Sequence, residues 1–118
     1  MALKAVEIIL SDAADAAVAA LAKSKAKEAT TITRRIAYYR ERLLADCLEG
    51  EVIPCPLPRK AKGLEAKHGP IANLYCCALP DFWRLLYTIV RADGKPYVYV
   101  LEIVDHGEYD KWFPGKGR

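Results

Sequence analysis

Two residues that could carry chemistry lie in or beside the most apolar part of the chain. Arg84 is the charged residue within residues 82–90, a segment rich in aromatic and β-branched side chains. A second segment of this kind, residues 97–104, is followed directly by Asp105 and His106. A charged side chain inside a buried strand must find a partner or face a cleft. We expect Arg84 to face a cleft, where His106 could approach it across a sheet and act as an acid or base near neutral pH.

Basic residues are concentrated in two other segments, although the formal net charge is only +3. Residues 23–42 include seven basic and two acidic side chains, and residues 59–67 include four basic and one acidic. Clustered cations favour a polyanionic partner such as nucleic acid, although they also occur on solvated helix faces and loops. The candidate RNA contacts of the second segment are Arg59, Lys60, Lys62 and Lys67.

The elements that would position these residues are strands. Asp93 and Gly94 separate the two apolar segments and are a strong signal for a hairpin turn. Residues 71–79 predict a preceding strand, so that three strands joined by short links form an antiparallel meander. Successive side chains of a strand point to opposite faces, and Trp83 should therefore face away from Arg84.

Residues 4–10 predict a first strand, and two helices follow it. Ser11 is a suitable N-cap for a helix over residues 12–23. A break near residues 23–27 precedes a second helix that extends to about Glu49, with Gly50 as its C-terminal stop. The apolar stripe of this helix consists of Ile32, Ile36, Tyr39, Leu43 and Cys47.

Residues 51–70 predict irregular, mainly extended chain, because prolines exclude a helix over much of this segment, and residues 59–63 predict a basic loop. Residues 108–113 predict one helical turn, and residues 114–118 a loose tail. The fold class is therefore α+β, in the order β-α-α-β-β-β, with a two-helix hairpin packed on a curved, mainly antiparallel sheet. A chain of 118 residues is expected to form a single domain over residues 1–118.

Two motifs resemble those of RelE/ParE-type toxins. Residues 79–89, LPDFWRLLYTI, are similar to the family's strand with a Trp/Tyr-Arg-Leu centre. Residues 100–106, VLEIVDH, followed by Tyr109, are similar to its final strand and terminal tyrosine. Archaeal RelE-like members are the most similar. The resemblance implies the toxin of a type II toxin–antitoxin system, a ribosome-dependent endoribonuclease that cleaves messenger RNA without a metal and thereby inhibits translation.

In this family the RNA's own 2′-hydroxyl attacks the phosphate, and Lys and Arg side chains supply much of the catalysis. The resemblance implies that Arg84 stabilises the phosphate charge, His106 acts as acid or base, and Tyr109 helps to position the nucleotide. Each residue could instead have a structural role. Arg84 could pair with Asp105 or Glu102, His106 could hold a strand end, and Tyr109 could lie in the core. The lysines in the region where family members carry catalytic ones are Lys60, Lys62 and Lys67.

The chain departs from the family pattern at its C-terminal motif. Many RelE-like toxins follow the final histidine with an arginine and a longer spacer, whereas here Gly107 follows His106 and Tyr109 is only three residues on. A ribonuclease with a different base and a weakened ribonuclease are both compatible with this departure. It is also compatible with a ParE-like inhibitor of DNA gyrase and with a domain that only binds RNA or protein.

The implied partners are a cognate antitoxin protein, the ribosome and messenger RNA in the cytoplasm, and no cofactor is implied. No apolar run approaches the roughly 20 residues of a membrane span, so no membrane partner is expected.

The cysteines Cys47, Cys55, Cys76 and Cys77 include no Cys-x-x-Cys pair. Because Cys76 and Cys77 are adjacent on a predicted strand, they point to opposite faces, which argues against a metal site. All four cysteines are expected to be buried small hydrophobic residues. The chain has no Gln, one Asn and one Met, a depletion typical of thermophiles. Intracellular disulfides occur in such organisms, so a Cys47–Cys55 bridge stays open.

Overall fold

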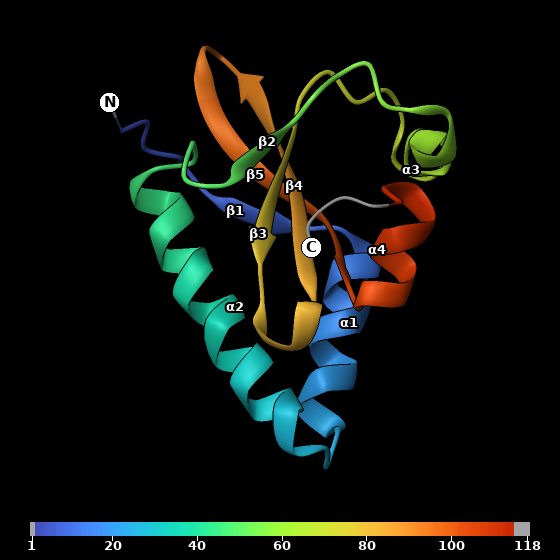
Figure 1. Cartoon of the computed structure of the whole chain (residues 1–118). Coiled ribbons are helices and arrows are strands. Elements are labelled where there is room, and N and C mark those ends of the chain that lie inside the picture. Colours follow the sequence, from blue (N-terminus) through green and yellow to red (C-terminus); the bar gives the residue numbers. More distant parts are fainter. Residues whose placement is uncertain (1, 115–118) are drawn as a thin grey trace.

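A five-stranded mixed sheet forms the centre of the molecule (Figure 1). The computed structural model describes residues 2–114. The strands are β1 (Ile8–Leu10), β2 (Glu51–Ile53), β3 (Leu74–Ala78), β4 (Arg84–Ala92) and β5 (Lys95–Val104). They are ordered β1-β5-β4-β3-β2; β1 runs parallel to β5, and the other three pairs are antiparallel. The predicted α+β class is confirmed.

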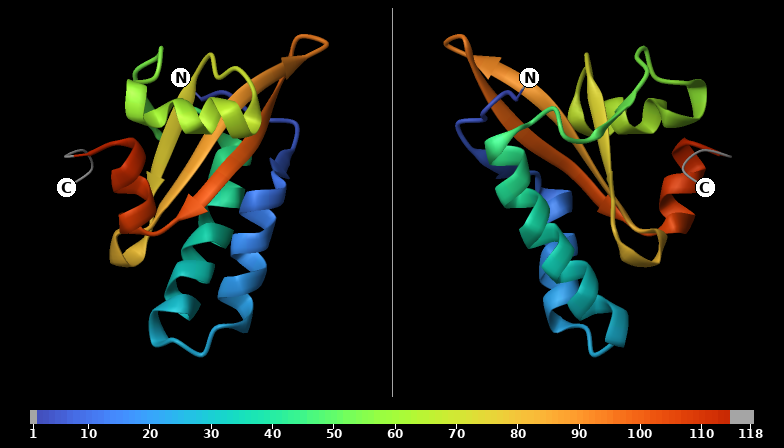
Figure 2. Two further views of the ribbon diagram at one scale, coloured as in Figure 1. Left: turned by 90° about the vertical axis from the view of Figure 1, so that its right-hand side faces the viewer. Right: turned by 60° about the vertical axis from the view of Figure 1, so that its left-hand side comes forward.

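Helices cover both faces of this sheet (Figure 2). They are α1 (Asp12–Lys23), α2 (Lys27–Ala45), α3 (Lys62–His68) and α4 (His106–Trp112), with 3₁₀ turns η1 (Arg59–Ala61) and η2 (Pro80–Phe82). The predicted hairpin of α1 and α2 lies on one face, and α3 and α4 lie on the other. The sheet is thus enclosed between two helical layers rather than covered on one side.

Each face of the sheet has its own apolar core. The first core lies under α1 and α2 and includes Ala14, Leu21, Ile32, Ile36, Leu43, Leu85, Tyr87, Val98, Val100 and Ile103. The second core lies under α3 and α4 and includes Leu64, Leu74, Leu86, Leu101, Val104, Tyr109 and Phe113. Cys77 belongs to the first core and Cys76 to the second, which confirms their predicted opposite orientation. All four cysteines are free thiols, so Cys47 and Cys55 are not bridged, and Cys55 is exposed rather than buried.

Several local predictions are confirmed. The Ser11 hydroxyl caps α1 by accepting a hydrogen bond from the Ala14 amide. The break between the helices lies at residues 24–26. Asp93 and Gly94 have φ values of 53° and 74°, both in the left-handed region, as a tight hairpin with matching strand twist requires.

The second helix is shorter than predicted. It ends at Ala45 rather than Glu49, because Asp46 adopts extended backbone and its carboxylate accepts hydrogen bonds from the Leu3 and Leu48 amides. Gly50 does not cap this helix. Its amide donates to the Tyr87 hydroxyl at 3.0 Å, and a Cβ at Gly50 would lie 2.7 Å from that oxygen. Glycine is needed there for close approach.

The prediction of irregular chain over residues 51–70 is wrong in part. This segment contains β2, η1 and α3, and the predicted basic loop is helical. The prolines keep residues 54–58 irregular, with a bend at Cys55 and Pro56, but a proline-free stretch follows in which Ala61 and Leu64 are fully buried in the second core. Burial of this apolar face stabilises a helix that is too short to form alone.

Strand and helix ends also differ from the predictions. The strand predicted over residues 4–10 is confined to β1, and that over residues 71–79 to β3. The next strand begins at Arg84 because the backbone turns at Asp81 and Phe82, whose φ values are positive. The C-terminal helix begins at His106 rather than at residue 108. Of the predicted tail, residues 115–118 lie outside the described residues.

Candidate functional site

A bulge in the central hairpin shapes the second face of the sheet. Leu86 of β4 pairs with Glu102 of β5, but the next residue, Tyr87, pairs with Val100, so that Leu101 is an extra residue in β5. Leu101 packs in the second core, and Glu102 contacts α3 on this same side. Bulges re-aim side chains and are frequent beside functional sites. Here the bulge directs a carboxylate toward α3.

Ser11 attaches the start of α1 to this bulge. Its hydroxyl donates to the Leu101 carbonyl at 2.6 Å and accepts from the Ala14 amide at 3.0 Å. One buried side chain therefore both caps the helix and satisfies a carbonyl of the bulged strand.

The end of α3 is fixed by a second carboxylate. Gly69 ends the helix at a φ of 86°, and its amide donates to the Glu65 carbonyl at 2.8 Å. The Glu65 carboxylate accepts from the Ile71 amide at 3.1 Å and pairs with Lys62 at 3.2 Å. The Ile71 hydrogen bond, followed by that of Lys62, lowers the pKa of Glu65. The two residues before Gly69 are therefore held in place.

Those two residues, Lys67 and His68, converge on Glu102. The Glu102 carboxylate oxygen Oε2 lies 2.6 Å from Nε2 of His68 and 2.8 Å from Nζ of Lys67. The side chains of Glu102 and His68 are only 5% and 9% exposed, whereas that of Lys67 is 52% exposed. A buried carboxylate requires such partners because desolvation disfavours an isolated charge.

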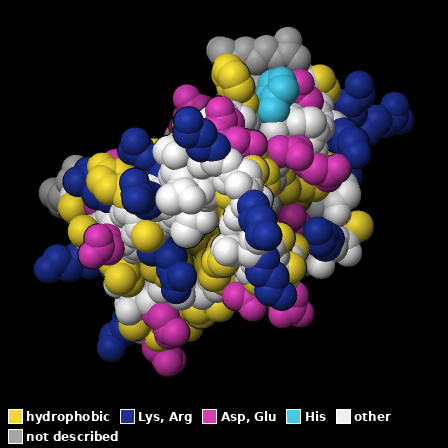
Figure 3. All heavy atoms as spheres, turned by 90° about the horizontal axis from the view of Figure 1, so that it is seen from below, with side chains coloured by type: hydrophobic (Ala, Val, Ile, Leu, Met, Phe, Trp, Pro, Cys, Tyr) yellow, Lys and Arg dark blue, Asp and Glu magenta, His cyan; other side chains and the backbone are white. Residues whose placement is uncertain are grey.

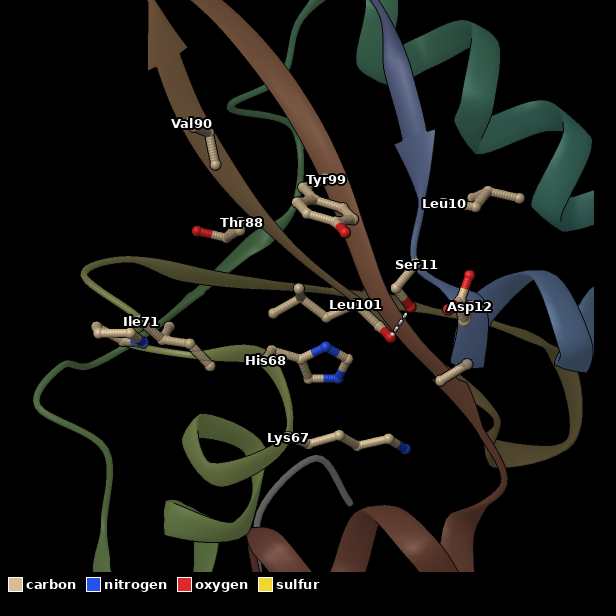
Figure 4. A pocket seen from close by; sticks show the side chains of 12 residues that line it. Leu10, Ser11, Asp12, Lys67, His68, Ile71, Thr88, Val90, Tyr99 and Leu101 are labelled. Atoms are coloured by element: carbon tan, nitrogen blue, oxygen red, sulfur yellow. Dashed lines mark hydrogen bonds between the residues drawn. The ribbon is translucent and has the colours of Figure 1, made fainter.

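Two members of this cluster, Lys67–His68–Glu102, line a pocket of about 630 Å³: Lys67 and His68 (Figure 4). The pocket is lined by residues 10–13, by Lys67, His68, Pro70 and Ile71, and by Thr88, Val90, Tyr99 and Leu101. Figure 4 shows Lys67 and His68 next to each other on one side, with Ser11 and Asp12 across from them. The pocket thus lies between β4, β5, the start of α1 and the end of α3, and Lys67 and His68 are placed where a bound molecule could contact them.

The arrangement can perform acid–base chemistry beside a cation. When Nε2–H of His68 donates to the ionised Glu102, the second ring nitrogen, Nδ1, is an acceptor that can remove a proton. Lys67 places a positive charge within reach of the same carboxylate and of solvent, where it can offset the charge of a bound anion. A histidine oriented by a carboxylate next to an ammonium group fits an anionic substrate whose reaction begins with loss of a proton.

Arg84 lies on the same sheet face as Glu102. It pairs with Val104, two positions along β5 from Glu102. Trp83 packs against the first core, so the two side chains point to opposite faces as predicted. The Arg84 side chain is buried rather than open to a cleft. The residue is 6% exposed, its guanidinium donates to the Trp83 carbonyl at 3.0 Å, and Cζ lies 5.3 Å from the centroid of the Tyr109 ring.

Tyr109 occupies the second core, which is one of the two positions predicted for it. It is 4% exposed and packs against Phe113 with ring centroids 5.2 Å apart. Burial, together with the neighbouring Cys76, raises the pKa of its hydroxyl to about 12. The Tyr109 ring stabilises the buried Arg84 guanidinium by a cation–π interaction.

His106 is placed apart from the pocket lining. It is the first residue of α4, its Nε2 lies 3.2 Å from the Asp110 carboxylate, and its ring lies 5.7 Å from that of Phe82. Its side chain is partly exposed, so it forms a small surface cluster with these two residues.

The four predicted RNA contacts separate into two pairs. Arg59 and Lys60 are exposed in η1. Lys62 and Lys67 belong to α3 and pair with Glu65 and Glu102 respectively. Of the four, Lys67 lines the pocket.

His68 was not predicted from the sequence. Glu102 was predicted only as a possible partner of Arg84. A signal for Glu102 was present, because it is a charged residue inside the apolar segment 97–104. A carboxylate buried in a strand needs a partner as much as the Arg84 guanidinium does. His68 carries no comparable signal apart from its place before Gly69 and Pro70.

No helix within residues 2–114 has the length and apolar content needed to cross a bilayer. The same residues contain no group of three or more His, Cys, Asp and Glu side chains placed to hold a metal ion. Comparisons of the chain with protein-family models, with curated proteins and with solved structures found no match.

Proposed function

We propose that this protein is a RelE/ParE-type toxin that cleaves messenger RNA on the ribosome, with the cluster Lys67–His68–Glu102 as its reacting group. One observation carries the proposal: a buried carboxylate holds a histidine at 2.6 Å and a lysine at 2.8 Å at the wall of an open pocket. The proposed chemistry replaces the base expected at His106 with His68. It thereby accounts for the departure of the C-terminal motif from the family pattern.

The proposed reaction uses the RNA's own nucleophile. Nδ1 of His68 takes the proton of a 2′-hydroxyl, and the 2′-oxygen attacks the adjacent phosphorus. Lys67 stabilises the negative charge that grows on the non-bridging oxygens. The bond from phosphorus to the 5′-oxygen breaks, and that oxygen takes a proton from water. The hydroxide formed in this step removes the proton from Nδ1 of His68, which restores the neutral imidazole. The products are a 2′,3′-cyclic phosphate end and a 5′-hydroxyl end.

Glu102 and Arg84 have positioning roles in this proposal. Glu102 orients the imidazole and offsets the positive charge that the imidazole gains with the proton. Arg84 of β4 lies against the Tyr109 ring of α4, and this contact supports the packing of α4 on the sheet face that carries Glu102. The basic residues Arg59, Lys60 and Lys62 precede or begin α3 and extend the positive surface along which RNA would lie.

A cleavage assay on translating ribosomes tests the proposal. Purified protein should cut messenger RNA in the presence of EDTA and leave 2′,3′-cyclic phosphate ends. His68→Ala and Lys67→Ala should each reduce the rate by about 10²–10³-fold, the typical effect of losing a proton-transfer or charge-stabilising group. Lys95→Ala at the exposed start of β5 is the matched control and should leave the rate unchanged.

Different outcomes would favour a different site or function. Loss of cleavage in His106→Ala but not in His68→Ala would move the reaction to the surface cluster at α4. Intact messenger RNA with reduced gyrase-dependent supercoiling would support the ParE-like inhibitor instead. Failure to recover a small, tightly bound partner after co-expression with the neighbouring genes would contradict the proposed antitoxin pairing.

A further inference from the structure

The solvent-facing side of α2 carries a stripe of basic and aromatic residues. Its members follow one another at spacings of three or four residues and lie on one side of the helix: Thr31, Arg34 or Arg35, Tyr38 and Arg42. Tyr38 is 43% exposed, so the core does not account for an aromatic residue at this position. Thr31, Arg34, Arg35 and Tyr38 surround a shallow hollow of about 360 Å³.

The Tyr38 ring holds two guanidinium groups together. Cζ of Arg35 lies 5.1 Å from its centroid and Cζ of Arg42 lies 5.9 Å from it. Tyr38 also meets Tyr39 edge to face with centroids 5.4 Å apart, and Tyr39 packs against the first core. The ring is therefore fixed from below, and it reduces the cost of placing two cations side by side on an exposed helix.

The charge of this stripe is only partly balanced. Arg42 pairs with Glu49 at 3.0 Å, an exposed contact. Within residues 2–114, no acidic side chain forms an ion pair with Arg34 or Arg35. In the view from the end of the helical hairpin, Lys and Arg side chains are interspersed with Asp and Glu side chains (Figure 3). The stripe is thus distinguished by the clustering of arginines on an aromatic ring rather than by net charge.

We propose that the stripe Arg34–Arg35–Tyr38–Arg42 is an RNA-binding site. Guanidinium groups bind phosphate oxygens through paired N–H donors, and unpaired bases stack on tyrosine rings or on guanidinium planes. Single-stranded RNA has both phosphates, which the arginines of the stripe can bind, and unstacked bases, which can stack on Tyr38. Duplex RNA would present phosphates but keep its bases stacked.

This site is independent of the pocket. The stripe lies on α2, which covers the first core, whereas Lys67 and His68 lie on α3 over the second core. A short RNA bound at the stripe therefore does not occupy the pocket. A partner that engages both sites must extend around the molecule.

Anisotropy of a fluorescent single-stranded RNA, titrated with the full chain, tests the site. His68→Ala serves as the background so that any cleavage is removed. Arg35→Gln and Tyr38→Ala should each weaken binding about tenfold, and Arg35→Gln should reduce the salt dependence by about one phosphate contact. Arg40→Gln is the matched control, because Arg40 is exposed on another side of α2, beside Glu7 and Glu41, and should change the affinity by less than about twofold.

Equal losses in Arg35→Gln and Arg40→Gln would overturn the proposal and leave only a net-charge effect. Tighter binding of a duplex than of the single strand would also overturn it. Circular dichroism of each variant checks that α2 is intact. If anisotropy responds as expected while ribosomal cleavage is never seen, the stripe is supported and the proposed nuclease activity alone fails.

Discussion

At the scale of single residues, Glu102 matters both for the stability of the fold and for the proposed site. It lies in an apolar strand, is almost fully buried, and accepts contacts from a lysine and a histidine that precede a glycine turn. Hydrogen bonds to a buried charge contribute more than neutral ones, and a partner left unpaired there is costly. The same carboxylate therefore holds α3 on the sheet and orients the proposed base.

Glu102→Gln should lower the free energy of unfolding by about 1–3 kcal/mol, because the amide keeps the shape but removes the charge that pairs with Lys67 and His68. Urea unfolding followed by circular dichroism measures this difference. Glu49→Gln removes the charge of an exposed pair with Arg42 and should cost much less, because solvent screens such pairs. Equal changes in the free energy of unfolding for the two substitutions would show that burial does not make the ion pairs of Glu102 stronger than an exposed pair.

Tyr87 is a second residue whose polar atom lies deep in the protein. Its hydroxyl donates to the Cys47 carbonyl at 2.7 Å and accepts from the Gly50 amide at 3.0 Å, so that one oxygen holds the segment after α2. Tyr87→Phe should cost about 1–3 kcal/mol because both backbone groups lose a partner. Tyr99→Phe on the neighbouring strand, where the side chain is exposed, should be close to neutral. The shift in denaturation midpoint compares the two.

At the scale of elements, the junction of β1 and α1 depends on one hydroxyl. Ser11→Ala removes the N-cap of α1 and the donor to the Leu101 carbonyl, and we expect a loss of about 1–2 kcal/mol. Ser24→Ala at the exposed C-terminal end of α1 should cost less, because its hydroxyl contacts only the nearby Ala26 amide. Thermal unfolding of the two variants provides the measurement. A larger loss in Ser24→Ala would contradict the role assigned to the Ser11 hydroxyl.

The elements that could be predicted from the sequence are those whose signals are local. The capping serine, the apolar stripe of α2 and the Asp93–Gly94 turn each act within a few residues. The helix α3 could not be predicted in this way, since it has seven residues and depends on burial of Leu64 against a distant sheet. The site depends on such elements, and it was therefore found only in part.

Lys67 was predicted as an RNA contact, but its relation to Glu102 depends on the bulge at Leu101. A bulge is a property of two paired strands and leaves no fixed pattern in either one. Arg84 was predicted to face away from Trp83 because alternation along a strand is local, and this orientation is confirmed. Its burial depends on α4, whose packing the alternation does not reveal.

At the scale of the whole molecule, the buried thiols of Cys76 and Cys77, one on each face of the sheet, predict an upper pH limit of stability. Burial raises the pKa of Cys76 to about 11 and, with the neighbouring Cys76 adding to the effect, that of Cys77 to about 12. The unfolded chain releases these protons from about pH 9, whereas the folded protein retains them. The stabilisation is thus fully present below pH 9 and is lost as the pH rises toward the folded pKa values.

The urea midpoint should accordingly be nearly constant from about pH 7 to pH 9 and fall between about pH 9 and pH 11. A variant with Cys76→Ala and Cys77→Ala starts from a lower stability but should show a shallower decline. An unchanged slope in this double variant would assign the alkaline loss to other groups, of which Tyr109 is one because its pKa is also raised to about 12.

The pairing of β1 with β5 has a consequence for the order of events during synthesis. The hydrogen bond from Ser11 to Leu101 spans 90 positions of the chain, and Glu102 follows directly after it. Contacts between distant parts of a chain close slowly and only after both parts exist. The helical hairpin can form early, but the sheet face that completes its core arrives with the last strand. The proposed nuclease is therefore assembled only after the ribosome has made β5.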